Sequence, residues 1–227
     1  WEFDRARETR IPTGGAALRA WSVSFSKDGK SLAAGLQPKD EGPEEPLEAE
    51  RVLIADLATR ETRLLPCKQS WVTSVAFSPD GNLLVSGSCD WEVKVWDFPS
   101  LTQRRSLETG VICTGVAFSP NSRCLAATGE RSIQLWNPYT GARLGEMSVA
   151  SGTVFCAAFS PDGGLLATGA DQATVWEVSS RKELGTMEGH NGAVVAVAFS
   201  PDGAFLATAC LDGSVRIRSV SKVVSAR

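Results

Sequence analysis

One short peptide recurs along the chain at a nearly constant interval, and this recurrence limits the possible folds more than any other feature. Ala-Phe-Ser-Pro-Asp-Gly occupies residues 76–81, 158–163 and 198–203, and the variant Ala-Phe-Ser-Pro-Asn-Ser occupies residues 117–122. An interval of about 40 residues is typical of tandem structural repeats. We therefore expect several copies of one small unit rather than a single irregular domain.

A second landmark keeps the same interval. Trp96, Trp136 and Trp176 lie in Val-Lys-Val-Trp-Asp, Ile-Gln-Leu-Trp-Asn and Thr-Val-Trp-Glu, and the last unit has Arg218 at this position. Short apolar and β-branched runs lie between the landmarks and are separated by turn residues such as Pro-Asp-Gly. This pattern predicts antiparallel strands joined by tight turns, so each unit is expected to be a small meander.

The pattern resembles the WD40-repeat family, whose units of about 40 to 45 residues form four-stranded blades. The resemblance covers nearly the whole chain and implies one all-β domain, a WD40-type β-propeller at residues 1–227. Phe3 and Phe25 keep the spacing of Trp96 and Phe118, which predicts a partial blade at residues 1–13. The five four-stranded blades are expected at residues 19–66, 71–108, 111–149, 152–187 and 193–227.

Five blades are fewer than the seven that rings of this family most often contain. Each blade in a ring is covered on both faces, whereas an uncovered face of roughly 350 Å² forgoes up to about 9 kcal/mol of burial. We therefore expect the chain to be part of a longer seven-bladed ring. The alternatives are an open array completed by another chain or a second copy, and a closed ring of five blades.

Charge and composition exclude several classes of ligand. The net charge is −3, so the chain lacks the basic surface that tracks nucleic acid phosphates. No apolar run reaches the roughly 20 residues that span a membrane, and no leader is recognised, which predicts a cytoplasmic protein without membrane contact. The six cysteines are scattered without a Cys-x-x-Cys pair and are interpreted as reduced thiols in the core.

The resemblance also implies a structural network of hydrogen bonds in each blade, which joins a His, a Ser or Thr, an Asp and the repeated Trp. No unit has all four residues, because Lys68 replaces the His in the second blade and Arg218 replaces the Trp in the fifth. We expect the network to be incomplete throughout. The matching residues are Ser86, Asp90 and Trp96 in the second blade and His190, Thr208 and Asp212 in the fifth.

The same residues argue against catalysis. His190 is the only histidine and lies where the structural His is expected, so no Ser-His-Asp or Cys-His arrangement can be assembled. We expect a protein that is not an enzyme and that needs no cofactor or metal.

One long insertion interrupts the repeat in the first blade. Residues 36–50 contain three prolines and six carboxylates, a composition that favours a solvated loop. Two interpretations stay open: a surface insertion without a role, or an acidic arm that docks a basic protein. The second interpretation assigns partner binding to Asp40, Glu41, Glu44 and Glu45.

Two tryptophans are candidates for partner binding. Trp91 lies in a predicted turn and Trp71 at the start of an inner strand, and exposed indoles often anchor protein interfaces. The alternative is that each indole packs over a neighbouring blade. The sequence thus predicts a non-catalytic WD40-repeat scaffold that mediates protein–protein interactions in a larger complex or multidomain protein. Two other functions stay open: an enzyme or small-molecule sensor that uses the central channel, and a structural subunit completed by another chain.

Overall fold

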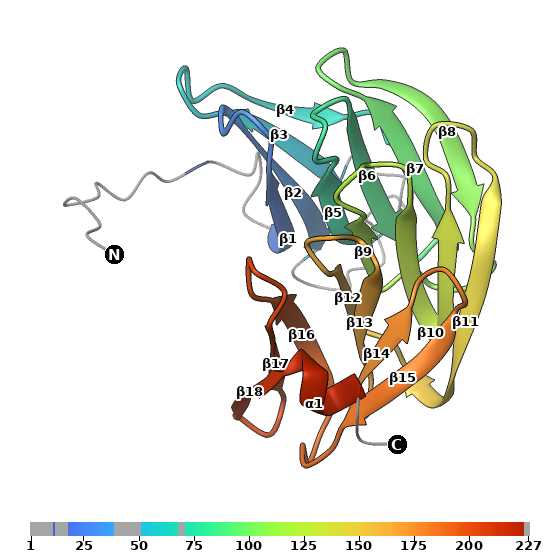
Figure 1. The fold of residues 1–227 in the computed structure, drawn as a ribbon. Helices are drawn as coiled ribbons and strands as arrows, with labels where there is room; N and C mark the ends of the chain where they lie inside the picture. Colours follow the sequence, from blue (N-terminus) through green and yellow to red (C-terminus); the bar gives the residue numbers. More distant parts are fainter. Residues whose placement is uncertain (1–10, 12–17, 39–50, 68–70, 225–227) are drawn as a thin grey trace.

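The computed structural model describes residues 11, 18–38, 51–67 and 71–224. These residues form five antiparallel sheets that follow one another along the chain, and a short helix comes after the last sheet (Figure 1). Consecutive strands are neighbours within each sheet, as in a meander. The predicted all-β architecture of successive meander blades is confirmed.

The strands are assigned to the five blades as follows. The first blade contains β1 (Leu18–Phe25), β2 (Ser31–Pro38), β3 (Val52–Asp56) and β4 (Thr62–Leu65). The second contains β5 (Val72–Phe77), β6 (Leu83–Ser88), β7 (Glu92–Asp97) and β8 (Thr102–Glu108). The third contains β9 (Gly115–Phe118), β10 (Leu125–Trp136) and β11 (Arg143–Thr153), and the fourth contains β12 (Cys156–Phe159), β13 (Leu165–Gly169), β14 (Ala173–Glu177) and β15 (Lys182–Met187). The fifth contains β16 (Val194–Phe199), β17 (Phe205–Cys210) and β18 (Val215–Ser219), and α1 (Val220–Val224) follows it.

The repeated peptide is the end of an inner strand and the turn that follows it. In the second blade, Ser78 Oγ donates a hydrogen bond of 2.6 Å to Asp80, and Asp80 accepts the N–H of Asn82 at 3.0 Å. Gly81 closes the turn with φ of 83°, a conformation that glycine adopts without steric cost. The variant copy has Ser122 at this point with φ of 60°.

The third blade has two strand positions within one continuous element. Residues Leu125–Thr128 of β10 pair with β9, whereas residues Ser132–Trp136 pair with β11. Arg131 lies between the two halves with φ of 53°, which allows a tight reversal without an intervening loop. β10 therefore takes both middle positions of a four-stranded blade.

The fifth blade differs from the expectation of four strands. Among the described residues it has three, and α1 follows β18 where an outer strand was expected. Val220 and Val223 of this helix are buried in the cluster between the fourth and fifth blades. The helix can lie against β15 because Gly185 has no side chain, and a Cβ there would be 2.0 Å from the carbonyl oxygen of Val223.

The hydrophobic core is divided into layers between neighbouring blades. Ile54 of the first blade and Phe77 and Trp96 of the second belong to one buried cluster, and similar clusters join the second to the third, the third to the fourth and the fourth to the fifth blade. Both faces of an internal blade are therefore covered, which explains why β6 is buried along its whole length.

Side-chain hydroxyls connect neighbouring inner strands. Ser22 accepts the backbone N–H of Val75 at 3.1 Å, and Ser24 accepts that of Phe77 at 3.0 Å. Ser74 accepts the N–H of Val116 in the same way, at 3.1 Å. These bonds satisfy edge N–H groups of the inner strands, which would otherwise stay unpaired.

The two terminal blades each expose an apolar face. On β1, Trp21, Val23 and Phe25 are exposed, and on β18, Val215 and Ile217 are exposed. These strands lie on the two sides of an opening in the arc of blades (Figure 1). Closure of the ring is therefore not seen in the described residues. The expected partial blade at residues 1–13 lies outside the described residues except for Ile11.

Candidate interaction rim

The turns between second and third strands and the segments that lead into inner strands lie at the same end of the blades, which we call the interaction rim. Trp91 lies here, in the turn between β6 and β7, with a side chain that is 61% exposed. Its backbone has φ of 65° and its carbonyl oxygen accepts the N–H of Thr109 at 2.9 Å. The turn is thus fixed while the indole faces solvent.

Trp71 lies beside the same turn. Its carbonyl oxygen accepts the N–H of Cys89 at 3.0 Å, which ties the start of β5 to the turn that contains Trp91. The indole of Trp71 is less exposed, at 39%. The structure therefore brings the two tryptophans to one rim of the second blade.

The rim has further exposed apolar side chains that the sequence reasoning did not select. Ile112 precedes β9 and is 46% exposed, and Leu211 lies in the turn between β17 and β18 and is 73% exposed. Both occupy rim positions of the repeat, Ile112 six residues before Phe118 as Trp71 is before Phe77. Alignment of the repeats on these positions would have identified them.

The charge on the interaction rim is mainly acidic. Among the described residues, the exposed basic side chains at this end are Arg19 and Arg131, and Lys94 is buried and pairs with Glu92 at 3.1 Å. Asp40, Glu41, Glu44 and Glu45, which were predicted to bind a partner, lie outside the described residues. The acidic residues of the rim are Asp90, Glu92, Glu108, Glu130, Asp171, Glu188 and Asp212.

The predicted network residues of the fifth blade lie together. His190 Nε2 is 2.7 Å from Thr208 Oγ1, and His190 Nδ1 is 3.1 Å from Ser214 Oγ and 3.6 Å from Asp212. Hydrogen bonds from the backbone N–H of Asn191 and from Ser214 hold the pKa of Asp212 well below its ordinary value. Both ring nitrogens of the buried His190 are engaged, so neither is placed to take a proton from a substrate.

In the second blade the structure joins the predicted residues Trp96 and Ser86 directly. Trp96 Nε1 donates to Ser86 Oγ at 3.2 Å inside the core. The N–H of Asp90 donates to Ser88 at 3.3 Å. The fourth blade repeats the Trp96–Ser86 bond between Trp176 and Thr168 at 2.8 Å, a pair that the sequence reasoning did not name.

One group in the described part of the chain has the composition of a metal site. The ligand atoms of His190, Cys210 and Asp212 lie within 4.8 Å of one another. The same atoms take part in hydrogen bonds, since Cys210 Sγ accepts the N–H of Asp212 at 3.4 Å and the imidazole is engaged as described.

Burial raises the pKa of Cys113 and of Cys156 to about 12, so these thiols stay protonated and are poor nucleophiles.

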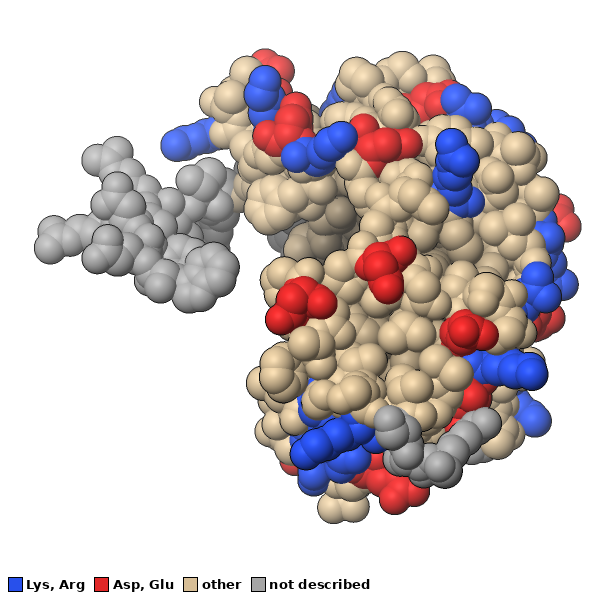
Figure 2. Space-filling view, in the orientation of Figure 1, with Lys and Arg blue, Asp and Glu red and all other residues tan. Residues whose placement is uncertain are grey.

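Basic side chains are dispersed on the face of the molecule shown in Figure 2. Lys and Arg lie mostly at its periphery, and a few separate acidic groups lie nearer the centre on an otherwise uncharged surface. Such an arrangement does not form the continuous basic stripe that follows a phosphate backbone. The described part of the chain has no helix with the length and apolarity needed to span a bilayer.

The arrangement of the blades defines a class of protein. Antiparallel meanders that pack face to face around a common axis form a β-propeller type of repeat protein. The family model of the WD domain, G-beta repeat, matches residues 59–97, 102–137, 142–176 and 181–219. The chain therefore belongs to the WD40-repeat family.

The chain is also similar to named proteins over part of its length. It is 35% identical over 92 residues to the small ribosomal subunit protein RACK1 of Medicago sativa, which is 40% of this chain and 28% of that protein. It is 34% identical over 79 residues to RACK1 of Schizosaccharomyces pombe, covering 35% of this chain and 25% of that protein. It is 32% identical over 117 residues to the ribosome biogenesis protein bop1 of Danio rerio, covering 51% of this chain but 15% of that protein.

Proposed function

We propose that this protein is a non-catalytic scaffold that binds other proteins through its interaction rim. The observation that carries this proposal is the pair Trp91 and Trp71, two exposed indoles held on one rim by backbone hydrogen bonds. A rigid, exposed aromatic side chain loses little conformational entropy on binding and buries a large area, which makes it an effective anchor. The packed blades keep these anchors at a constant separation from the other turns of the rim.

The partner is proposed to be a basic protein within a ribosome-related assembly in the cytoplasm. Two considerations support this proposal. The rim of the described residues has more exposed acidic than basic side chains, which favours the approach of a positively charged surface. The relatives named above include a small ribosomal subunit protein and a ribosome biogenesis protein. The acidic insertion at residues 36–50 is proposed to extend the same binding surface.

The two exposed end faces are proposed to be covered by further sheets of the same kind, from additional sequence or from another chain. Phe25 and Phe77 hold equivalent places in the repeat, yet Phe25 is 64% exposed and Phe77 is 8% exposed. Phe118 and Phe159, at the same place in the other internal blades, are partly buried and pack against the core clusters, so this position is suited to burial in the terminal blade as well. Completion of the ring would also set the interaction rim on a closed scaffold.

The proposal predicts that Trp91→Ala separates binding from stability. The substitution removes an exposed side chain, so the free energy of unfolding should change by less than about 1 kcal/mol. Association with ribosomal subunits, measured by co-sedimentation in a sucrose gradient, should fall strongly, and further in the double variant with Trp71→Ala.

Leu144→Ala is the matched control, because Leu144 is exposed on the outer strand β11, away from the interaction rim. It should leave co-sedimentation unchanged. A large loss of stability in Trp91→Ala with normal co-sedimentation would show that the indole stabilises the fold and does not bind the partner.

A further inference from the structure

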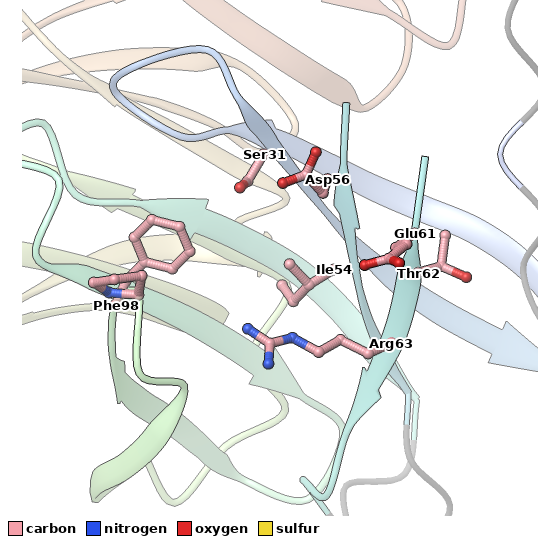
Figure 3. A pocket seen from close by; sticks show the side chains of 8 residues that line it. Ser31, Ile54, Asp56, Glu61, Thr62, Arg63 and Phe98 are labelled. Carbon is pink, nitrogen blue, oxygen red and sulfur yellow. The ribbon is translucent and has the colours of Figure 1, made fainter. Parts of the chain in front are cut away.

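A pocket lies between the first and second blades, at the end opposite the interaction rim. Its volume is about 530 Å³, and a neighbouring hollow of about 430 Å³ shares Ser31, Asp56, Phe98 and Pro99 with it. Figure 3 shows Ile54 and Phe98 facing the space, with Asp56 and Glu61 on one side and Arg63 on the other. The pocket therefore combines an apolar floor with charged groups of both signs.

The guanidinium of Arg63 makes different contacts from that of Arg105, its counterpart in the second blade. Arg63 pairs with Ile54 across β3 and β4, and Arg105 pairs with Val95 across β7 and β8, so the two arginines have equivalent positions. Arg105 donates to the carbonyl oxygen of Tyr139 at 2.6 Å and thereby bridges to the third blade.

No such bridge forms from Arg63. The turn at Phe98 and Pro99 occupies the place that the turn at Tyr139 has in the third blade, but the pocket lies between this turn and Arg63. Within the described residues, the guanidinium of Arg63 has neither a hydrogen bond nor an ion pair. Arg105 connects the second and third blades, whereas Arg63, at the equivalent position of the first blade, is available to an external ligand.

The surroundings of Arg63 restrict the charge of that ligand. Asp56 accepts the N–H groups of Ala58 and Thr59, both at 2.8 Å, which lowers its pKa and keeps it ionised. Glu61 adds a second carboxylate to the wall. Within the 530 Å³ pocket, two negative charges beside one guanidinium disfavour a doubly charged phosphate and favour a single carboxylate with a cation next to it. Lys27 and Lys30 line the neighbouring hollow and not this pocket.

The apolar floor restricts the rest of the ligand. Phe98 packs edge to face against Phe77, with ring centroids 4.8 Å apart, so its position is determined by the core. Ile54 belongs to the same core cluster. A floor held in this way can receive an apolar side chain without rearrangement.

We propose that this pocket binds an extended segment of a partner protein, in which one carboxylate pairs with Arg63, an adjacent apolar side chain covers Phe98 and a basic side chain lies near Asp56 and Glu61. The site lies at the opposite end of the blades from Trp91. It is therefore a second binding site, independent of the interaction rim.

The test uses an array of acetylated, amidated heptapeptides with a central Glu flanked by varied apolar and basic residues, probed with the intact protein. Each peptide has a matched version in which Gln replaces the Glu, and a third version that ends in a free α-carboxylate at the same position. We expect capture of Glu peptides and about tenfold weaker capture of their Gln versions, as for the loss of one charge-assisted contact. Methyl resonances of Ile54 should shift on addition of the captured peptide.

Arg63→Met should abolish capture and leave the melting temperature unchanged. Arg105→Met, its matched control, should lower the melting temperature and retain capture. The free α-carboxylate series identifies whether the carboxylate comes from a side chain or from a chain terminus. Equal capture of Glu and Gln peptides, capture of none, or a lower melting temperature in Arg63→Met with normal capture would each overturn the proposal. Trp91→Ala should not affect this assay, so the outcome is independent of the proposed function of the rim.

Discussion

At the scale of single residues, the repeated tryptophan differs between blades in whether its indole N–H has a hydroxyl acceptor. Trp96 and Trp176 each donate to a hydroxyl, on Ser86 and Thr168. Trp136 has the same place in the third blade, but its Nε1 is buried and, among the described residues, has no partner. The equivalent second-strand residue is Ala127, which has no oxygen in its side chain. A buried donor without a partner is destabilising.

Ala127→Ser is predicted to stabilise the protein. The new hydroxyl would accept the hydrogen bond from Trp136 Nε1, which should raise the free energy of unfolding by about 1 kcal/mol. Chemical denaturation measures this change. Ala126→Ser is the control, because Ala126 is buried on the opposite face, in the cluster with Trp176, and should lower stability. Equal losses in the two variants would contradict the expectation.

Asp80 connects two blades through a single carboxylate. One of its oxygens accepts from Ser78, and the other accepts from the hydroxyl of Tyr139 in the third blade. Partial burial raises the pKa of Asp80, but these hydrogen bonds outweigh burial and lower it to about 2. The ionised form is therefore favoured in the folded state.

The depressed pKa predicts a defined dependence on pH. A carboxyl whose pKa is lower when folded contributes stability above its ordinary value of 3.8, and this contribution disappears as the pH falls toward about 2. The difference in unfolding free energy between the native protein and Asp80→Asn should be constant above this window and shrink within it. Tyr139→Phe should raise the pKa of Asp80 in an NMR titration of its carboxyl carbon. An unchanged pKa in that variant would show that Tyr139 has no part in the shift.

At the scale of elements, the position of α1 depends on a residue in the neighbouring blade. The helix has five residues, too few to be stable alone, so its packing against β15 holds it in place. Gly185 makes this packing possible, since any side chain there would meet the backbone of Val223. Elements of the fourth and fifth blades are thus joined by close backbone contact as well as by buried valines.

Gly185→Ala is predicted to displace α1. The added methyl group would overlap the helix backbone, and hydrogen exchange at residues 220–224 should become faster while the inner strands stay protected. The loss of global stability should be about 1–3 kcal/mol, as for an overpacked core. Gly164→Ala is the control, because a Cβ there would come no nearer than 3.5 Å to another residue. Unchanged exchange in α1 would contradict this account of the packing.

At the scale of the whole molecule, the end faces distinguish this chain from a closed ring. Ile217 is 68% exposed, whereas Val95 and Val175, its equivalents in internal blades, are fully buried. Phe25 and Phe77 show the same contrast on the face that a blade turns toward the preceding blade, whereas Ile217 lies on the face toward the following one. The sequence places core residues on every blade alike, and the presence of a neighbour then determines whether they are covered.

This difference in exposure predicts different losses of unfolding free energy when the equivalent residues Phe77 and Phe25 are each replaced by Ala. In the chain alone, Phe77→Ala should lower the free energy of unfolding by about 3–5 kcal/mol, and Phe25→Ala should change it by less than about 1 kcal/mol. Light scattering should show less self-association for Phe25→Ala, because an exposed apolar group is removed. If Phe25→Ala cost as much as Phe77→Ala, the first face would already be covered in solution.

Several features could be predicted from the sequence because they depend on local chemistry. The spacing of Phe77, Phe118, Phe159 and Phe199 identified the inner strands, and Pro-Asp-Gly identified the turns after them, since strand alternation and turn conformations are set within a few residues. The bond between Trp96 and Ser86 and the proximity of His190 to Thr208 were anticipated from positions in the repeat. α1 was not anticipated, because the same valine-rich residues favour a strand until the room beside Gly185 is taken into account.

The sequence by itself therefore determined the unit: four short strand positions, their turns and the residues that face each neighbouring unit. The tertiary structure alone decided which of those faces have a neighbour. It also decided that Arg105 bridges two blades while Arg63 faces a pocket, and that Trp91 and Trp71 share a rim. The physical reason is that strand and turn preferences act over a few residues, whereas burial, hydrogen-bond pairing and pocket shape depend on side chains brought together from separate units.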